Sequence, residues 1–278
     1  MKKVISASRR TDIPAFYLDR LIGFLRQGFA DVPNPYSGRS ARIDLKPENV
    51  HTIVLWSKNF SRFLRKRECF SDYNLYFLFT INDMPSLEPS VPPLDDRLGQ
   101  LRDMAHIYGP DRIAWRYDPV VFDINGAVST VESYRKIGLE AAQAGVRRSI
   151  FSFMDMYGKV TMRNERFGLN LIDPPDSVKE RYASELAGTA VSLGLSLETC
   201  SEESVSVEGI KPSACIEGKL LSKLAGEPAS LAKDTGQRPA CNCTVSRDIG
   251  SYRDMPCPQG CLYCYANPMV PEPVREES

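Results

Sequence analysis

The chain has 278 residues, of which 42% are hydrophobic and 25% are charged, the proportions of a globular protein with a full hydrophobic core. Its 35 Lys and Arg residues balance its 35 Asp and Glu residues. A neutral chain has no general attraction for a nucleic-acid backbone, so its charge does not indicate nucleic acid as a partner. No stretch is apolar enough for a signal or membrane segment, and we therefore expect a cytoplasmic protein with no membrane partner.

Short runs of β-branched, aliphatic and aromatic residues recur along the first 199 residues. They predict strands at 4–8, 52–56, 75–81, 112–117, 149–154 and 195–199. Amphipathic patterns predict helices at 15–27, 59–66, 94–107, 126–144, 177–193 and 217–224, and a Pro- and Gly-containing stretch at 32–47 predicts a turn or hairpin. Ser177 and Glu180 have the spacing of a capping box, and Gly194 suits the residue after a helix.

The regular alternation of strand and helix predicts the fold. Six such units favour a parallel sheet, either as a barrel or as a doubly wound sheet. No glycine-rich phosphate-binding motif follows a strand, which disfavours the nucleotide-binding forms of the doubly wound sheet. We therefore predict an α/β protein with a partial (β/α)6 TIM-like barrel at 1–199, a cysteine-rich extension at 200–269 packed on the barrel mouth, and a disordered tail at 270–278.

The cysteines are the strongest chemical signal in the sequence. Seven of the eight fall between Cys200 and Cys264. In a chain without a secretory signal, this clustering favours metal binding over disulfides. Cys257, Cys261 and Cys264 share one short C-x-x-x-C-x-x-C segment. Three thiolates on one loop can bind three irons of a [4Fe–4S] cluster and leave the fourth iron open to a small molecule.

The other four cysteines of this region form a second candidate metal site. They are Cys200, Cys215, Cys241 and Cys243, and four thiolates are enough for a second [4Fe–4S] cluster or for a structural zinc ion. Buried or redox-active thiols are the third possibility. Cys69 lies apart from the group and is expected to be a packed or free thiol.

The C-x-x-x-C-x-x-C segment, with Tyr263 immediately before its last cysteine, resembles the cluster-binding loop of the radical S-adenosylmethionine (SAM) superfamily. That superfamily typically has an incomplete barrel of six strand–helix units. The chain as a whole resembles an uncharacterised bacterial family with a radical-SAM-like cysteine cluster at its C-terminus, and segments 8–14, 56–59, 115–119, 237–238, 248–250 and 261–267 carry this resemblance. Segment 116–119 is also similar to spore photoproduct lyases, radical SAM enzymes that repair DNA.

The position of the cysteine loop departs from the superfamily pattern. In radical SAM proteins the loop follows the first barrel strand, whereas here it lies near the end of the sequence. The tail would therefore have to fold back over the barrel mouth to place a cluster where the first loop normally does. Glycine-rich SAM-contacting motifs are also not evident after the second strand.

The resemblance implies an enzyme that cleaves SAM at the [4Fe–4S] cluster and abstracts a hydrogen atom from an unknown small-molecule or nucleotide-like substrate. An electron donor such as ferredoxin or flavodoxin is the implied partner. The polar strand ends supply most of the implied site residues, which are Arg9, Arg10, Lys58 and Asn59 for cofactor binding and Arg116, Asp118 and Glu198 for catalysis. Tyr263 of the cysteine segment is the fifth implied cofactor-binding residue. An ordinary salt bridge at the barrel mouth is the alternative for each charged member.

Two other functions remain open at the level of the sequence. The first is a zinc- or cluster-stabilised binding or electron-transfer protein that does not cleave SAM. The second is a barrel hydrolase that uses Asp118 and Glu198 as paired carboxylates, with the cysteines purely structural.

Overall fold

The fold is built on one eight-stranded parallel sheet. The computed structural model describes residues 1–33, 39–202, 205–270 and 272. The strands of the sheet lie in the order β12 (Lys211–Pro212), β11 (Ser196–Thr199), β9 (Arg148–Phe153), β6 (Ile113–Val120), β5 (Leu75–Thr80), β4 (Val50–Ser57), β1 (Lys3–Ala7) and β13 (Arg247–Asp248). The six predicted strands are confirmed as β1, β4, β5, β6, β9 and β11.

The strand order explains where the helices lie. From β1 to β11 the strands neighbour each other in the order of the sequence, as in a (β/α)6 barrel. Right-handed crossovers in one direction place the connecting helices on one face of the sheet. The described pairings do not join β12 to β13, so the structure shows a parallel α/β sheet whose closure into a barrel is not seen among these strands.

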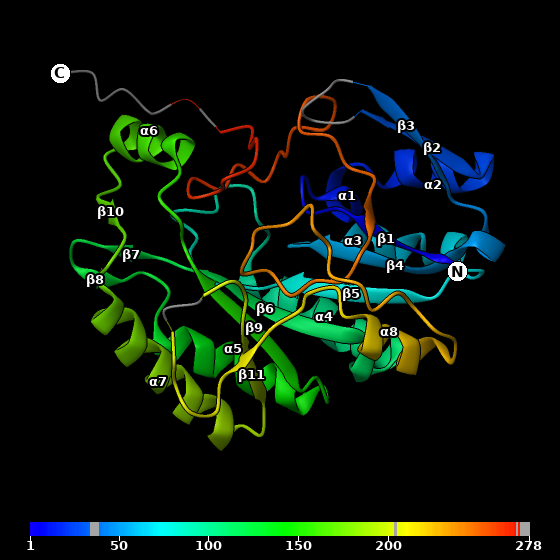
Figure 1. Cartoon of the computed structure of the whole chain (residues 1–278). Helices are drawn as coiled ribbons and strands as arrows, with labels where there is room; N and C mark the ends of the chain where they lie inside the picture. The colour runs from blue at the N-terminus through cyan, green and yellow to red at the C-terminus, as the bar shows by residue number, and fades with distance from the viewer. Residues whose placement is uncertain (34–38, 203–204, 271, 273–278) are drawn as a thin grey trace.

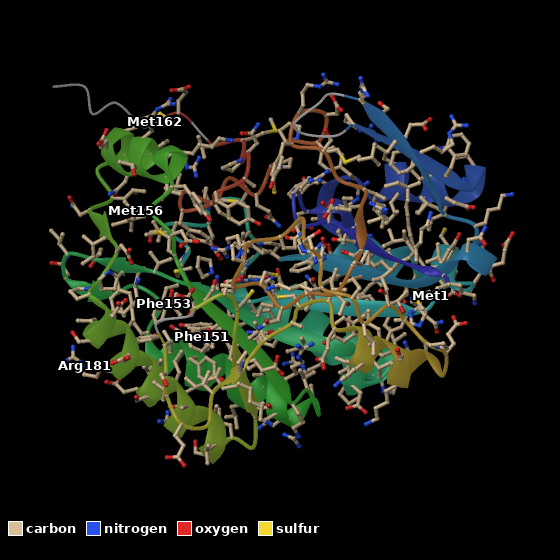
Figure 2. All side chains as sticks on the ribbon, viewed as in Figure 1. Met1, Phe151, Phe153, Met156, Met162 and Arg181 are labelled. Carbon is tan, nitrogen blue, oxygen red and sulfur yellow. The ribbon has the colours of Figure 1, made fainter. Side chains whose placement is uncertain are left out.

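The outer face of the sheet carries the helices and the largest hydrophobic cluster. The long helices are α4 (Leu94–Tyr108), α5 (Val131–Gln143) and α7 (Asp176–Ser192). Trp115 of β6 stacks on Tyr134 of α5 with ring centroids 4.8 Å apart. Phe153 of β9, labelled in Figure 2, meets Tyr182 of α7 at 6.3 Å. Aromatic packing therefore fixes the helices to this face.

The inner face of the sheet is covered by the C-terminal segment. Val54, Leu78 and Ile150 point to this face and form one buried cluster with Leu221 of α8 (Gly218–Ala225) and with the cysteines at 215, 241 and 243. Figure 1 shows the yellow-to-orange segment crossing in front of the strands. The residues after β11 thus fill the concave side of the sheet as well as extending over its edge.

The remaining elements are short. They are α1 (Ile13–Phe16), α2 (Leu18–Gln27), β2 (Phe29–Pro33), β3 (Ser40–Asp44), α3 (Ser61–Arg65), β7 (Phe122–Asp123), β8 (Gly126–Ala127), α6 (Gly158–Phe167) and β10 (Leu171–Ile172), with 3₁₀ turns at Pro47–Asn49, Arg67–Phe70 and Pro110–Arg112. The antiparallel pair β2 and β3 confirms the predicted hairpin excursion. Of the predicted disordered tail only residues 270 and 272 are described, so that prediction lies almost wholly outside the described residues.

Several predicted boundaries were wrong. The helix predicted to begin at 126 begins at Val131, because residues 122–127 pair as β7 and β8. The predicted capping box is also wrong, because α7 begins one residue before Ser177 and Pro175 occupies the capping position. Gly194 does follow α7 with a positive φ of 67°. No helix in the described residues is both long and apolar enough to cross a membrane.

Candidate functional site

The C-x-x-x-C-x-x-C segment forms a closed loop. The Cys257 N–H donates to the Asn267 carbonyl at 3.0 Å, and the Met269 N–H donates to the Cys257 carbonyl at 2.8 Å. Gly260 turns the chain between them with a positive φ of 67°, a conformation that glycine adopts without a steric penalty. These contacts bring the two ends of the segment together, so Cys257, Cys261 and Cys264 share one compact loop.

This loop lies on the carboxyl ends of β1 and β4. Asp12, just after β1, is buried and accepts hydrogen bonds from the Gln259 side chain at 2.9 Å, the Ser57 hydroxyl at 2.6 Å and the Lys58 N–H at 2.9 Å. Asp12 therefore ties the cysteine loop to two neighbouring strand ends. Burial raises the pKa of Asp12, although all of its hydrogen bonds oppose this rise.

A buried group of charged side chains contacts the cysteine loop. The Lys58 ammonium lies 2.7 Å from Glu88, and the Tyr263 hydroxyl donates to the same Glu88 carboxylate. Arg97 approaches this carboxylate at 3.9 Å, beyond hydrogen-bonding distance. Burial alone would raise the pKa of Glu88, but Lys58, Tyr263 and Arg97 together hold it below its usual range. Lys58 also faces Cys261, the most deeply buried thiol of the loop.

The three thiols of the loop are poor acids in the metal-free protein. Burial raises the pKa of Cys257 to about 12, and it also raises the pKa values of Cys261 and Cys264. The charge of Cys264 adds to the rise in the pKa values of both Cys257 and Cys261. A metal ion would have to replace their protons, as metal binding to thiols generally does.

The other four cysteines of the C-terminal region also meet. The sulfur atoms of Cys200 and Cys215 are 3.7 Å apart, and the Cys243 thiol interacts with those of Cys215 and Cys241. We call Cys200, Cys215, Cys243 and Cys241 the thiol row. All eight cysteines of the chain are free thiols. In the described part of the chain, no three His, Cys, Asp or Glu side chains are already arranged to hold a metal ion.

Two arginines and a tryptophan flank the thiol row on the inner face of the sheet. The guanidinium of Arg9 lies 5.2 Å from the ring of Trp56, and that of Arg116 lies 4.9 Å from the same ring. Arg9 also acts electrostatically on Cys243, and it donates a hydrogen bond to the Ser246 hydroxyl at 3.2 Å. Arg116 acts electrostatically on Cys200 and Cys215. The thiol row therefore lies in a positively charged environment.

The remaining candidate residues are engaged in separate contacts. Arg10 donates to the Gly250 carbonyl at 2.9 Å, and the Asn59 side chain accepts the Ser61 N–H at the start of α3. Asp118 accepts hydrogen bonds from Arg116 and Ser152. Glu198 is held by Arg148 at 2.7 Å, with further hydrogen bonds at 2.9 and 3.1 Å. The structure thus brings Lys58 and Tyr263 together but does not gather all eight candidates at one point.

Sequence reasoning missed residues that organise the loop. Asp12 was seen only as part of a polar strand end, and Glu88 lies in a loop after β5 with no periodic pattern around it. Asp248 of β13 was also missed, although it accepts hydrogen bonds from the side chains of Ser6 and Ser8 at 2.9 and 2.6 Å. Ser8 and Asp248 are 240 residues apart in the sequence. Local sequence patterns cannot predict a contact over such a separation.

The fold and these contacts define an α/β protein with a parallel sheet and a thiol-rich C-terminal segment packed against it. The chain belongs to the family described as Domain of unknown function (DUF1848), whose profile matches residues 4–266. No curated protein matches this chain.

Two solved structures are distantly similar to the chain. A crystal structure of D-hydantoinase is 14% identical, with a TM-score of 0.33 over 63% of this chain and 42% of that one. A structure provisionally assigned as an alpha-L-fucosidase from Bacteroides thetaiotaomicron is 10% identical, with a TM-score of 0.32 over 72% of this chain and 86% of that one. These similarities leave the radical SAM resemblance untested, and it stays a prediction.

Proposed function

We propose that Cys257, Cys261 and Cys264 hold a [4Fe–4S] cluster and that the protein is a radical-SAM-like enzyme with an unknown substrate. The observation that supports this most directly is the closed three-thiol loop on the carboxyl ends of β1 and β4. In parallel α/β folds this edge of the sheet is where sites are built. When bound, such a cluster supplies an electron that cleaves SAM and generates a radical able to remove hydrogen from a substrate.

The residues present fit a cluster with one open iron. The loop offers three thiols, and the other four cysteines of the region are occupied with one another in the thiol row. An iron–sulfur cluster bound by thiolates is anionic, and the positive charges of Lys58 and Arg163 act on Cys261 and Cys264. Arg163 also fixes the loop by donating to the Leu262 carbonyl at 2.8 Å.

The five cofactor-binding candidates contribute differently to this proposal. Lys58 and Tyr263 hold the loop in place through Glu88, and Lys58 gives it positive charge. Arg10 contacts the segment that leads into the loop, where it donates to the Gly250 carbonyl and faces the Tyr252 ring at 5.9 Å. We therefore propose Arg10 as a partner for the SAM carboxylate. Arg9 is turned toward the thiol row, and Asn59 supports α3.

Arg116 and Asp118 are the catalytic candidates that the geometry favours, and both lie within β6. Their ion pair can orient a polar substrate there. Glu198 is already bound by Arg148 through three short contacts, so its charge is neutralised within the sheet. No observation therefore favours the alternative hydrolase, which requires both carboxylates to act on a substrate.

The test is anaerobic preparation followed by a SAM-cleavage assay. Protein reconstituted with iron and sulfide should bind about four irons at this loop. Reductant and SAM should then release deoxyadenosine. The triple variant Cys257→Ala, Cys261→Ala and Cys264→Ala should lose this iron and the release, whereas Cys69→Ser, at an exposed cysteine outside both groups, should retain them.

Two results would change the proposal. A fully loaded cluster that releases no deoxyadenosine would instead identify a cluster-stabilised binding or electron-transfer protein. The same iron content in the triple variant would show that the loop is not the cluster site at all. Reduction of the loaded protein by ferredoxin or flavodoxin would identify the class of its electron donor.

A further inference from the structure

The thiol row is a buried site in its own right. Cys200 follows β11, Cys215 lies between β12 and α8, and Cys241 and Cys243 precede β13. Cys215 and Cys243 are each 2% exposed, and Cys241 is 8% exposed. Three separate segments therefore bring four thiols to one place beneath the inner face of the sheet. Buried thiols that serve only as packing do not need to gather in this way.

Several N–H donors around the thiol row would favour negative charge on its sulfur atoms. Cys243 accepts a hydrogen bond from the Ile216 N–H at 3.4 Å, and the guanidinium of Arg9 acts on it electrostatically. Buried N–H groups with no partner remain on Arg9, Arg116 and Trp56, namely Nη2, Nε and Nε1. An unsatisfied buried donor is costly, and a buried positive charge is more so. Four thiolates around a dication would carry a net charge of −2, and their sulfur atoms would be acceptors for these unpartnered N–H groups.

The carboxylates near these arginines do not accept from the unpartnered N–H groups. Asp118 pairs with Arg116 through another guanidinium nitrogen, Nη2, and also accepts a hydrogen bond from Ser152. Asp248 acts on Arg9 electrostatically, but its hydrogen bonds come from Ser6, Ser8 and backbone N–H groups. The unpartnered guanidinium N–H groups therefore have no carboxylate acceptor in the described structure, and the sulfur atoms are the acceptors beside them.

The spacing of the sulfur atoms indicates one ion. Sulfur atoms bound to the same zinc ion at about 2.3 Å, in a tetrahedron, lie about 3.8 Å from each other. The Cys200 and Cys215 sulfurs are 3.7 Å apart, and Cys243 contacts two neighbours. In a [4Fe–4S] cluster each thiolate binds a different iron, which holds the four sulfurs well apart. The distance between the Cys200 and Cys215 sulfurs fits a shared ion.

We propose that Cys200, Cys215, Cys241 and Cys243 bind a single zinc ion in a closed tetrahedral site. Rotation of Cys200 and Cys241 about their Cα–Cβ bonds would fold the two ends of the thiol row around the ion, and the four thiols would release their protons to solvent. A zinc site with four protein ligands is structural. This ion would fasten the C-terminal segment to the inner face of the sheet, independently of any SAM chemistry.

The test measures zinc bound to a variant that lacks the three cysteines of the C-x-x-x-C-x-x-C loop. The full-length triple variant Cys257→Ala, Cys261→Ala and Cys264→Ala is prepared with zinc, desalted, and examined by elemental analysis and native mass spectrometry. We expect about one zinc per chain. Adding Cys241→Ser and Cys243→Ser should abolish it, and adding Cys69→Ser instead should leave it unchanged.

A cobalt titration of the same triple variant keeps the test independent of the serine substitutions, which alone could unfold the chain. Cobalt in a tetrahedral four-thiolate site gives intense visible absorption, and zinc should displace it at one equivalent. Arg9→Gln should weaken zinc binding roughly 10- to 100-fold, the usual effect of removing a hydrogen bond to a ligand. A zinc affinity unchanged by Arg9→Gln would contradict the role given to Arg9.

Three outcomes would overturn the proposal. One is about four irons with sulfide in the triple variant, lost in the serine variants, which would identify a cluster. The second is no bound metal with no cobalt spectrum, and the third is zinc that survives both serine substitutions. None of these depends on SAM cleavage, so failure of the proposed enzyme activity and failure of the zinc site are separate results.

Discussion

Glu88 is the residue on which the buried charges beneath the cysteine loop depend. It is 3% exposed and neutralises Lys58, while Arg97 lies just beyond hydrogen-bonding distance. Glu88→Gln would leave two buried cations without a counter-charge, and we expect it to lower the free energy of unfolding by about 3–5 kcal/mol. Urea denaturation at pH 7 measures this loss. Glu68→Gln, on an exposed carboxylate 3.3 Å from Arg67, should change stability by less than about 0.5 kcal/mol.

The same residue predicts a pH dependence. The pKa of Glu88 is lowered in the folded protein, so its ionised form stabilises the fold. This contribution is complete above the ordinary glutamate pKa and is lost as the pH falls through the lowered value. Wild-type stability should therefore fall on acidification below about pH 4.3 more steeply than that of Glu88→Gln. Parallel stability curves for the two proteins would contradict the assignment.

At the scale of single residues the sequence located the cysteines but not their supports. The C-x-x-x-C-x-x-C spacing lies within one loop, so its grouping could be read directly. The thiol row combines three segments, and its four cysteines were predicted as one candidate metal site from their number, although only Cys241 and Cys243 are close in the sequence. Glu88, Asp12 and Asp248 act through partners far away in the sequence, and pattern reasoning reports only local spacing.

At the scale of elements, the contact between β1 and the segment after β13 is tight. A Cβ atom on Gly250 would lie 2.1 Å from the Ser8 hydroxyl oxygen and 2.7 Å from its Cβ. Gly250→Ala should therefore separate this segment from β1 and destabilise the protein by about 1–3 kcal/mol. Thermal unfolding and hydrogen exchange of the β1 amides would measure the effect. No loss of stability would show that the contact is looser than described.

Gly188 provides the matched control within a helix. It lies in α7, and a Cβ atom there would meet nothing within 4 Å. Gly188→Ala should stabilise the protein by about 0.5–1 kcal/mol, because alanine loses less entropy than glycine in a helix. The two substitutions add the same methyl group and should act in opposite directions.

The elements with strong local patterns were predicted well. Runs such as that of β5 are apolar on both faces because helices cover one side and the C-terminal segment the other. Weaker elements were missed. Helix α6 has one fully buried residue, Val160, and β12 and β13 are two residues long, so tertiary contacts rather than local pattern place them.

At the scale of the whole molecule, the residues after β11 complete the core. A chain that ends after Cys200 would expose Val54, Leu78 and Ile150 on the inner face of the sheet. We expect this shortened chain to be insoluble or to bind a hydrophobic dye strongly. A chain that ends after Val270 should fold like the full-length protein, since Glu272 makes only an exposed ion pair with Arg166. A soluble, cooperatively folded chain ending at Cys200 would contradict this view.

The overall architecture was predictable for residues 1–199, where strands and helices alternate. Alternation gave the parallel sheet and its strand order, since consecutive units tend to lie side by side. It could not show that the sheet continues beyond β11 and β1 into β12 and β13. It also could not show that α8 lies against the inner face, because an amphipathic helix shows only that it has one apolar side.

The pairing of β13 with β1 joins the last strand of the sequence to the first. During synthesis, β1 leaves the ribosome long before its neighbour at Arg247–Asp248 has been made. The inner face of the sheet and the edge of β1 therefore stay uncovered until the segment after β11 has been made. Translation at about 5–20 residues per second sets the length of that delay. The sheet is therefore complete only after Arg247–Asp248 has been made, and until then the edge of β1 has no strand beside it.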